Sequence, residues 1–146
     1  MPTRDPAAPR GGTLFELLAC LMIASVVLAL SVPRYHAWHD EIAAREAASD
    51  VVNVLGSARE AAVLRAAFVA VVLDTAADTV WWHSEGAIVG RHAVAARYGV
   101  DVAANRDSVV YDPSGLGYGA STVTIILRRG AAAETITVSR MGRVHW

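Results

Sequence analysis

Apolar and polar positions divide the chain into three stretches with different periods. The first is an almost unbroken apolar run over residues 14–32, and its 19 residues approach the roughly 20 that an α-helix needs to cross a bilayer. Glu16 lies near the start of this run. An unpaired acid at the centre of a membrane helix costs roughly 2.5 to 3.5 kcal/mol. We therefore expect the carboxylate of Glu16 to have a role that offsets this cost.

The second stretch, residues 34–68, keeps a helical pattern. It contains no proline, many alanines and a single glycine, Gly56. The residues that recur at helical spacing and form one apolar face are Ile42, Val51, Val52, Leu55, Ala58 and Ala62. Pro33 is expected to kink the helix rather than to end it. The pattern predicts one long N-terminal helix, with its first half in a membrane or filament core and its second half packed under a globular head.

The third stretch begins at residue 69, where the period shifts towards two, as in strands. The segments that fit strands are residues 68–74, 78–84, 108–112, 121–129 and 134–140. The glycine-rich residues 112–119, "DPSGLGYG", lack the Gly-Lys-Ser/Thr ending of a phosphate-binding loop, so we expect a hairpin loop there. The predicted fold class is α+β, with the long helix packed on an antiparallel β-sheet head built as one sheet or two.

Two adjacent tryptophans lie within the second predicted strand. Because successive side chains of a strand point to opposite faces, Trp81 and Trp82 are expected on different sides of the sheet. One of them is then part of the core. The other, if exposed, is a candidate contact with another subunit.

The position of Glu16 separates several interpretations of the N-terminus. A secretory signal would have an uninterrupted apolar stretch before a small-residue cut such as Ala29-Leu30-Ser31, and Glu16 interrupts that stretch. A lipoprotein signal would place the apolar run before Cys20, whereas most of the run follows it. A simple membrane anchor fits the length but leaves Glu16 unexplained.

A fourth interpretation of the N-terminus explains why Glu16 interrupts the apolar run. Residues 11–17, Gly-Gly-Thr-Leu-Phe-Glu-Leu, resemble the processing site of prepilin-type proteins. The resemblance implies that a prepilin peptidase removes the leader, residues 1–11, by cutting after Gly11, and that the new terminus is N-methylated. Gly12, which stands where the family usually has Phe, becomes the terminus, and Glu16 becomes the fifth mature residue. Its carboxylate can then pair with the cationic α-amine of a neighbouring subunit as the helices bundle.

The head resembles one subfamily more closely. Ala58-Arg59, Ala62-Val63, Arg65 and Val69 follow a signature typical of the minor pseudopilin H (GspH) and FimT family. "VVYDPSGLGYG" and "ITVSRMGRV" resemble two later segments of the same family. Arg59 and Arg65 fit a packing role or a solvated helix face equally well.

The resemblance implies an architecture and a function. The expected architecture is a type IV pilin-like lollipop, in which residues 12–33 form the membrane or filament-core helix and residues 34–146 form the amphipathic helix and the β-rich head. The expected function is that of a minor pseudopilin in type II secretion, anchored by a single span in the bacterial inner membrane with its head in the periplasm. The implied partners are major and other minor pseudopilins or pilins and the inner-membrane assembly platform.

The alternative function is a FimT-like minor type IV pilin that binds DNA for natural transformation. FimT-type DNA binders resemble one another in a Gly-Arg-x-Arg motif, whereas this chain has Gly142-Arg143-Val144-His145. Four arginines against one glutamate make residues 128–146 locally basic, although residues 34–146 carry 11 Arg and 12 acids. The candidate phosphate contacts are Arg128, Arg129, Arg140, Arg143 and His145. We favour the structural subunit.

Catalytic and metal chemistry find little support in the sequence, so neither an enzyme nor a cofactor is expected. Cys20 is the single cysteine, which leaves no intrachain disulfide and no cysteine-based metal site. His36 and His39 lie three apart on the helix without a third ligand pattern, so solvated positions are expected. The aspartates considered for calcium are Asp74, Asp78, Asp101 and Asp112. Turn chemistry accounts for them without an ion.

Overall fold

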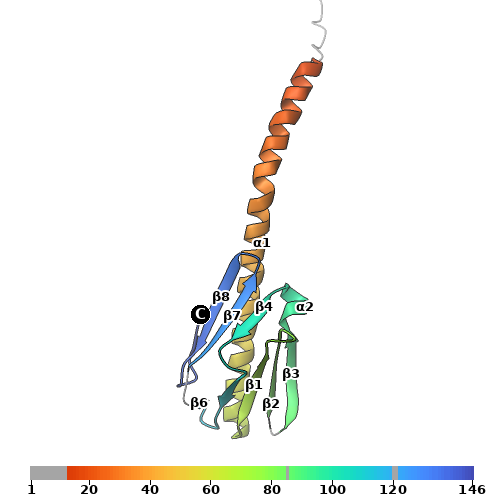
Figure 1. The fold of residues 1–146 in the computed structure, drawn as a ribbon. Coiled ribbons are helices and arrows are strands. Elements are labelled where there is room, and N and C mark those ends of the chain that lie inside the picture. The colour runs from red at the N-terminus through yellow and green to blue at the C-terminus, as the bar shows by residue number, and fades with distance from the viewer. Residues whose placement is uncertain (1–12, 85, 120–121) are drawn as a thin grey trace, which may run out of the picture. The chain divides into compact units, whose positions relative to one another are not determined.

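The computed structural model describes residues 13–84, 86–119 and 122–146. The chain divides into two compact units, Met1–His36 and Ala37–Trp146. Helix α1 (Leu14–Arg65) has 52 residues and continues through Pro33, as predicted (Figure 1). The predicted leader, residues 1–11, and Gly12 lie outside the described residues.

In the second unit, one stripe of α1 is buried, and it is built largely from alanine. Its buried residues are Ala43, Ala44, Ala47, Ala48, Val51, Val54, Leu55, Ala58 and Ala62. The prediction for Val51, Leu55, Ala58 and Ala62 is confirmed, whereas the one for Ile42 is wrong, because its side chain is 37% exposed. Ile42 precedes Val51 by nine residues, which is two and a half helical turns at 3.6 residues per turn and puts it on the opposite side.

Sheet A contains five antiparallel strands in the order β3-β2-β1-β5-β6. The strands are β1 (Val69–Asp74), β2 (Thr79–Ser84), β3 (Ala87–Ala93), β5 (Ser108–Tyr111) and β6 (Gly117–Tyr118). The register between β2 and β3 shifts between Trp82, which pairs with Gly90, and His83, which pairs with Ile88. Val89 is therefore an extra residue that bulges from the edge strand.

Sheet B contains four antiparallel strands in the order β4-β7-β8-β9. They are β4 (Asp101–Ala104), β7 (Val123–Arg129), β8 (Ala132–Val138) and β9 (Val144–His145). A short helix, α2 (Val94–Tyr98), connects the two sheets and ends at Gly99, whose φ of 64° is the left-handed conformation that glycine adopts without strain. The prediction of an antiparallel head is confirmed in its two-sheet form.

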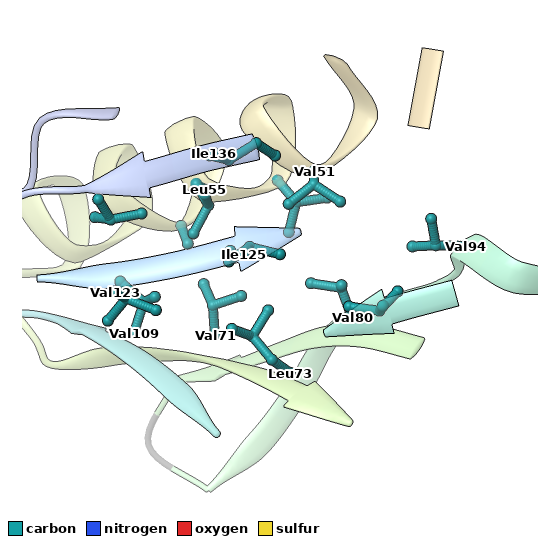
Figure 2. Packing of buried hydrophobic residues seen from close by; sticks show 14 of the residues in the cluster. Val51, Leu55, Val71, Leu73, Val80, Val94, Val109, Val123, Ile125 and Ile136 are labelled. Carbon is teal, nitrogen blue, oxygen red and sulfur yellow. The ribbon is translucent and has the colours of Figure 1, made fainter. Parts of the chain in front are cut away.

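The core lies between the buried stripe of α1 and the inner faces of the two sheets. Figure 2 shows Val51 and Leu55 of the helix, Ile125 and Ile136 of sheet B, and Val71 of sheet A directed into this common space. Tyr111 is the largest side chain among those that are almost completely buried. Alternation along the strands produces this core, since β1 and most of β7 bury every second residue.

Candidate functional site

The start of α1 carries the predicted assembly residue. Glu16 lies exposed in the first turn, where a carboxylate interacts favourably with the helix dipole. Its backbone N–H donates to the hydroxyl of Thr13 at 3.4 Å and to the carbonyl oxygen of Thr13 at 2.9 Å. Thr13 and Glu16 thus have the spacing of a capping box, a local pattern that the sequence analysis missed.

The helix that follows is apolar and uncovered within the described part of the chain. It is long and apolar enough near its N-terminus to cross a membrane, and none of that stretch is buried. Its hydroxyls are satisfied by the helix itself, because Ser25 and Ser31 donate to carbonyl oxygens four residues earlier, at 2.7 and 2.8 Å. The residues proposed for processing, Gly11 and Gly12, lie outside the described residues.

The arginines predicted to bind DNA do not form one cluster. Arg128 is exposed at the end of β7 and pairs across the strands with Ala133, while His145 pairs with Thr137. Ala133 and Thr137 are four residues apart on β8, which corresponds to about 13 Å. Arg128 therefore lies towards one end of sheet B, and Arg140, Arg143 and His145 lie towards the other.

Arg129 is already engaged inside the head. Its Nε donates to Asp40 Oδ1 of α1 at 3.0 Å, and its guanidinium also donates to the carbonyl oxygen of Tyr98. The contact joins α1, α2 and the β7–β8 hairpin. Arg45 joins the same helix to the hairpin more loosely, with Nε 3.6 Å from Glu134 Oε1. Arg129 has a structural role that a sequence count of cations does not reveal.

A cation that the sequence analysis did not select lies close to Arg140. Arg106 and Arg140 line the same hollow of about 230 Å³ where β5 and β6 meet the ends of β7 and β8. Tyr118 also lines it, and the side chain of this tyrosine is 66% exposed. Neither guanidinium makes an ion pair with an acid in the described part of the chain. Arg106 is separated from Arg140 by 34 positions, so only the fold brings them together.

The glycine-rich connection is a structural element. Arg59 Nε donates to the carbonyl oxygen of Gly115 at 2.8 Å, which gives Arg59 the packing role. A Cβ at Gly117 would lie 2.8 Å from the carbonyl oxygen of Arg140, and a Cβ at Gly142 would lie 3.0 Å from that of Gly115. The connection and the C-terminal turn therefore pack backbone against backbone, which leaves no room for side chains.

Two of the four aspartates considered for calcium act in turns, whereas Asp101 lies in β4 and Asp78 accepts from the N–H of Val102 at 2.7 Å across 24 positions. Asp112 Oδ1 accepts hydrogen bonds from the hydroxyl and N–H of Ser114 and from the N–H of Leu116. These bonds, that from the Ser114 hydroxyl first, hold the pKa of Asp112 below its ordinary value. Asp74 Oδ1 accepts from the N–H groups of Ala76 and Ala77, at 3.1 and 3.0 Å. Turn chemistry thus explains both aspartates, as predicted.

The histidines form no metal centre among the described residues, where no group of three His, Cys, Asp or Glu side chains is close enough to hold an ion. The ring of His36 contacts that of Tyr35 edge-on, with centroids 6.2 Å apart. His92 lies 3.6 Å from Asp50 of α1, and Arg97 of α2 lies 3.8 Å from the same carboxylate. These contacts tie β3 and α2 to the helix.

Two comparisons place the chain among known proteins. The model of the family described as type II transport protein GspH matches residues 47–142, which is more than half of the chain. Two crystal structures of the type IV minor pilin FimU of Pseudomonas aeruginosa are similar in fold, with TM-scores of 0.60 and 0.58 at 14% and 13% identity. The matches cover 70% and 69% of this chain and 86% and 90% of the FimU chains.

A search of curated protein sequences finds no match. The two structural matches confirm the type IV pilin fold, in which a long N-terminal helix packs on antiparallel sheets. The family match extends from Ala47 in α1 to Gly142 in the C-terminal turn, so it includes nearly all of the head. The chain belongs to the family of the type II transport protein GspH.

Proposed function

We propose that the protein is a minor pseudopilin, a structural subunit of the pseudopilus of a type II secretion system. The observation that carries this proposal is the match of residues 47–142 to the family described as type II transport protein GspH. The apolar first half of α1 supports it. Side chains there are exposed within the chain, so a bilayer before assembly and neighbouring helices afterwards would cover them.

The proposed life cycle begins with an inner-membrane precursor that spans the bilayer once and holds its head in the periplasm. A prepilin peptidase cuts after Gly11 and leaves Gly12 as the new terminus. An inner-membrane assembly platform then moves the subunit into the filament. There the carboxylate of Glu16 pairs with the terminal amine of a neighbouring pilin-type subunit, which offsets the cost of an acid in an apolar environment.

The test separates the charge of Glu16 from its capping role. Gln serves in a capping box as Glu does but carries no charge. Glu16→Gln and Glu16→Ala should both insert and fold, because the head is built from residues beyond Ala37, and both should be poorly recovered with sheared pseudopili from cells. Ser25→Ala, a polar position of the same helix that bonds only to its own backbone, should be recovered normally.

Two outcomes would contradict the proposal at different levels. Normal recovery of the Glu16→Gln variant would show that Glu16 acts only as a capping residue. Absence of the unmodified protein from the pseudopilus fraction, with normal amounts in the membrane, would reject the structural-subunit function itself.

DNA binding is the second candidate, and one observation favours it. Arg106 and Arg140 line a common hollow, and cations gathered in this way can bind the phosphates of DNA. Binding of duplex DNA by the full chain in detergent should fall steeply with salt and weaken in Arg140→Ala and Arg143→Ala. Arg128→Ala, towards the other end of sheet B, is the control. Equal binding by all three variants would reject this site.

A further inference from the structure

The hollow lined by Arg106 and Arg140, which we call the arginine hollow, combines hydrogen-bond donors with apolar side chains. The side chains in its lining that can donate are Arg106, Arg140, Ser108 and Ser139. The buried core residues in its lining are Val109, Val123 and Val138. A ligand with an anionic head on a short aliphatic stem fits both groups, since its head can meet the donors while its stem lies on the valines.

The donors of the arginine hollow are not used within the head. The side chains of Arg106, Arg140 and Ser108 donate to no other residue in the described part of the chain. The hydroxyl of Ser139 accepts from the N–H of Arg143 at 3.2 Å, which leaves its own proton free to donate. An ionised carboxylate only accepts hydrogen bonds and can pair with a guanidinium through both oxygens. It can therefore take up several of these donors at once.

The walls of the arginine hollow carry positive charge alone. No acidic side chain of residues 13–84, 86–119 or 122–146 lines it. Asp107 lies between Arg106 and Ser108 in the sequence but is not part of the lining. The carboxylate of Asp112 accepts from Ser114 and Leu116 within its own turn. An anion in the hollow thus meets two cations and no carboxylate on its walls.

Exposed apolar side chains surround the arginine hollow. Tyr118, which lines it, is 66% exposed, and the 52% exposed ring of Phe68 contacts Tyr118 edge-on, with centroids 5.1 Å apart. Leu116 and Met141 are chain neighbours of residues in the lining and are also exposed. Aromatic residues, methionine and arginine are the types enriched where one protein binds another.

The apolar surface continues over the outer side of sheet A. Trp81 lies on the same side of the sheet as Tyr118, while Trp82 packs against the core, which confirms the predicted division of the two tryptophans. Asp74 and Arg91 also lie on this side, so its charges are of both signs. The unbalanced positive charge is at the arginine hollow.

These surroundings distinguish a protein carboxylate from the phosphates of DNA. Interfaces with DNA are polar, and a phosphate backbone would leave the valines of the hollow and the rings of Phe68 and Tyr118 without apolar contacts. An acidic side chain that projects from an apolar protein surface would cover all of them. The observations therefore favour a protein as the occupant.

We propose that the arginine hollow binds an aspartate or glutamate side chain of a neighbouring pilin-type subunit whose sequence differs from this one. The inference rests on the proposed function as a filament subunit and names the chemistry through which its head holds a partner. The two guanidinium groups pair with the carboxylate, and the hydroxyls of Ser108 and Ser139 donate to its remaining lone pairs. Apolar residues beside the acid cover Phe68 and Tyr118.

Photo-cross-linking of the full chain, in cells that make it together with the other pilin-type subunits, identifies the occupant. Benzoylphenylalanine is placed at Tyr118, beside the hollow, and in a control chain at Thr135, which is exposed on β8. The probe at Tyr118 should join the chain to another pilin-type subunit at or next to an acidic residue, as mass spectrometry of the joined peptides shows. The probe at Thr135 should not give this product.

Charge variants in the Tyr118 probe background test the role of the arginines. Arg106→Gln combined with Arg140→Gln should lower the yield of the cross-link at least about tenfold, and Arg128→Gln, towards the other end of sheet B, should leave it unchanged. Replacing the joined acid of the partner by arginine should lower the yield equally. Arg106→Glu combined with Arg140→Glu should restore the cross-link to that partner variant.

Several results would overturn the inference. They are a cross-link to an exported protein or to a second copy of this chain, a joined peptide without an acid, and a yield that does not depend on Arg106 and Arg140. Binding of duplex DNA by the full chain in detergent, lost in the double glutamine variant, would assign the hollow to nucleic acid instead.

Recovery of the Tyr118 probe chain with sheared pseudopili separates the contact from the function. Normal recovery without the cross-link would reject the contact and leave the filament-subunit function standing. Absence of the unmodified protein from pseudopili would reject that function first, and the contact with it.

Discussion

At the scale of single residues, the sequence motifs of the head turn out to be packing devices. Arg59 of α1 holds the carbonyl oxygen of Gly115 across 56 positions of the chain. Gly117 and Gly142 allow the connection after β5 and the C-terminal turn to touch through their backbones. A cation and two glycines that suggest ligand chemistry in a sequence thus hold the end of the head together.

Replacing Arg59 tests this role. Arg59→Ala leaves the Gly115 carbonyl without its donor and should lower the free energy of unfolding by about 1.5 to 3 kcal/mol, the usual contribution of a hydrogen bond to a charged group. Arg65→Ala, at the exposed end of the same helix, should change it by less than about 0.5 kcal/mol. Denaturant titration of both full-length variants in detergent measures the difference, and equal effects would contradict the role.

The buried ring of Tyr111 predicts a response to alkaline pH. Its hydroxyl has no hydrogen-bond partner in the described part of the chain, and burial raises its pKa from 10.0 to about 12. The unfolded chain therefore loses this proton first, and the free energy of unfolding should fall by about 2 to 3 kcal/mol as pH rises from 10 to 12.

The variant Tyr111→Phe removes both the unpaired hydroxyl and its titration. It should be at least as stable as the unmodified protein at pH 7 and should lack this part of the alkaline loss. Tyr118→Phe, which changes an exposed ring, should keep the loss. Thermal unfolding followed from pH 7 to pH 11.5 checks both, and a full alkaline loss in Tyr111→Phe would contradict the assignment.

At the scale of elements, one ion pair holds the β7–β8 hairpin to α1. Arg129 and Asp40 meet beside Gly130, where φ is +55° and an added Cβ would lie 2.5 Å from Asp40 Oδ2. Gly130→Ala therefore combines backbone strain with displacement of the carboxylate. The prediction is a loss of about 2 to 4 kcal/mol in the free energy of unfolding.

The matched control for Gly130→Ala is Gly86→Ala. Gly86 also has a positive φ, +82°, but no atom lies within 4 Å of an added Cβ. Backbone strain alone should cost this variant about 1 to 2 kcal/mol. The difference between the two variants in denaturant titrations measures the contribution of the Asp40 contact. Equal losses would show that the ion pair does not stabilise the hairpin.

Periodicity explains which elements could be predicted from the sequence. The long apolar and alanine-rich runs specify α1, and short runs rich in β-branched residues specify β1, β7 and β8. The segment containing β3, α2 and β4 was missed, because β3 is an edge strand whose residues are mostly exposed and α2 is only five residues long. Ile42 was misplaced because apolar residues were counted without their angle around the helix.

The candidate site was less predictable than the fold. Glu16 and the adjacent tryptophans follow from local spacing. The ion pair between Arg129 and Asp40 joins residues that are 89 positions apart in the sequence. Arg106 and Arg140, which line the same hollow, are 34 positions apart. A count of charges along the sequence cannot separate an arginine that holds two elements together from one that is available to a ligand.

At the scale of the whole molecule, the proposed cleavage after Gly11 determines where the mature chain begins. We predict that the mature chain begins at Gly12, with or without one added methyl group. Intact-mass measurement of the protein purified from membranes of a host with a prepilin peptidase checks this, and a peptidase-deficient host is the control. A retained leader in both hosts, or a chain that begins after Ser31, would contradict the prepilin interpretation.

The bulge at Val89 has a consequence for how such a subunit avoids aggregation. Exposed strand edges can recruit further strands and so start fibrous aggregates. In this head the edge strands β6 and β9 have two residues each, β4 has four, and the seven-residue β3 is interrupted by the bulge. Its sheets are poor templates for edge-to-edge growth, so copies of the head that lie side by side can remain folded and separate.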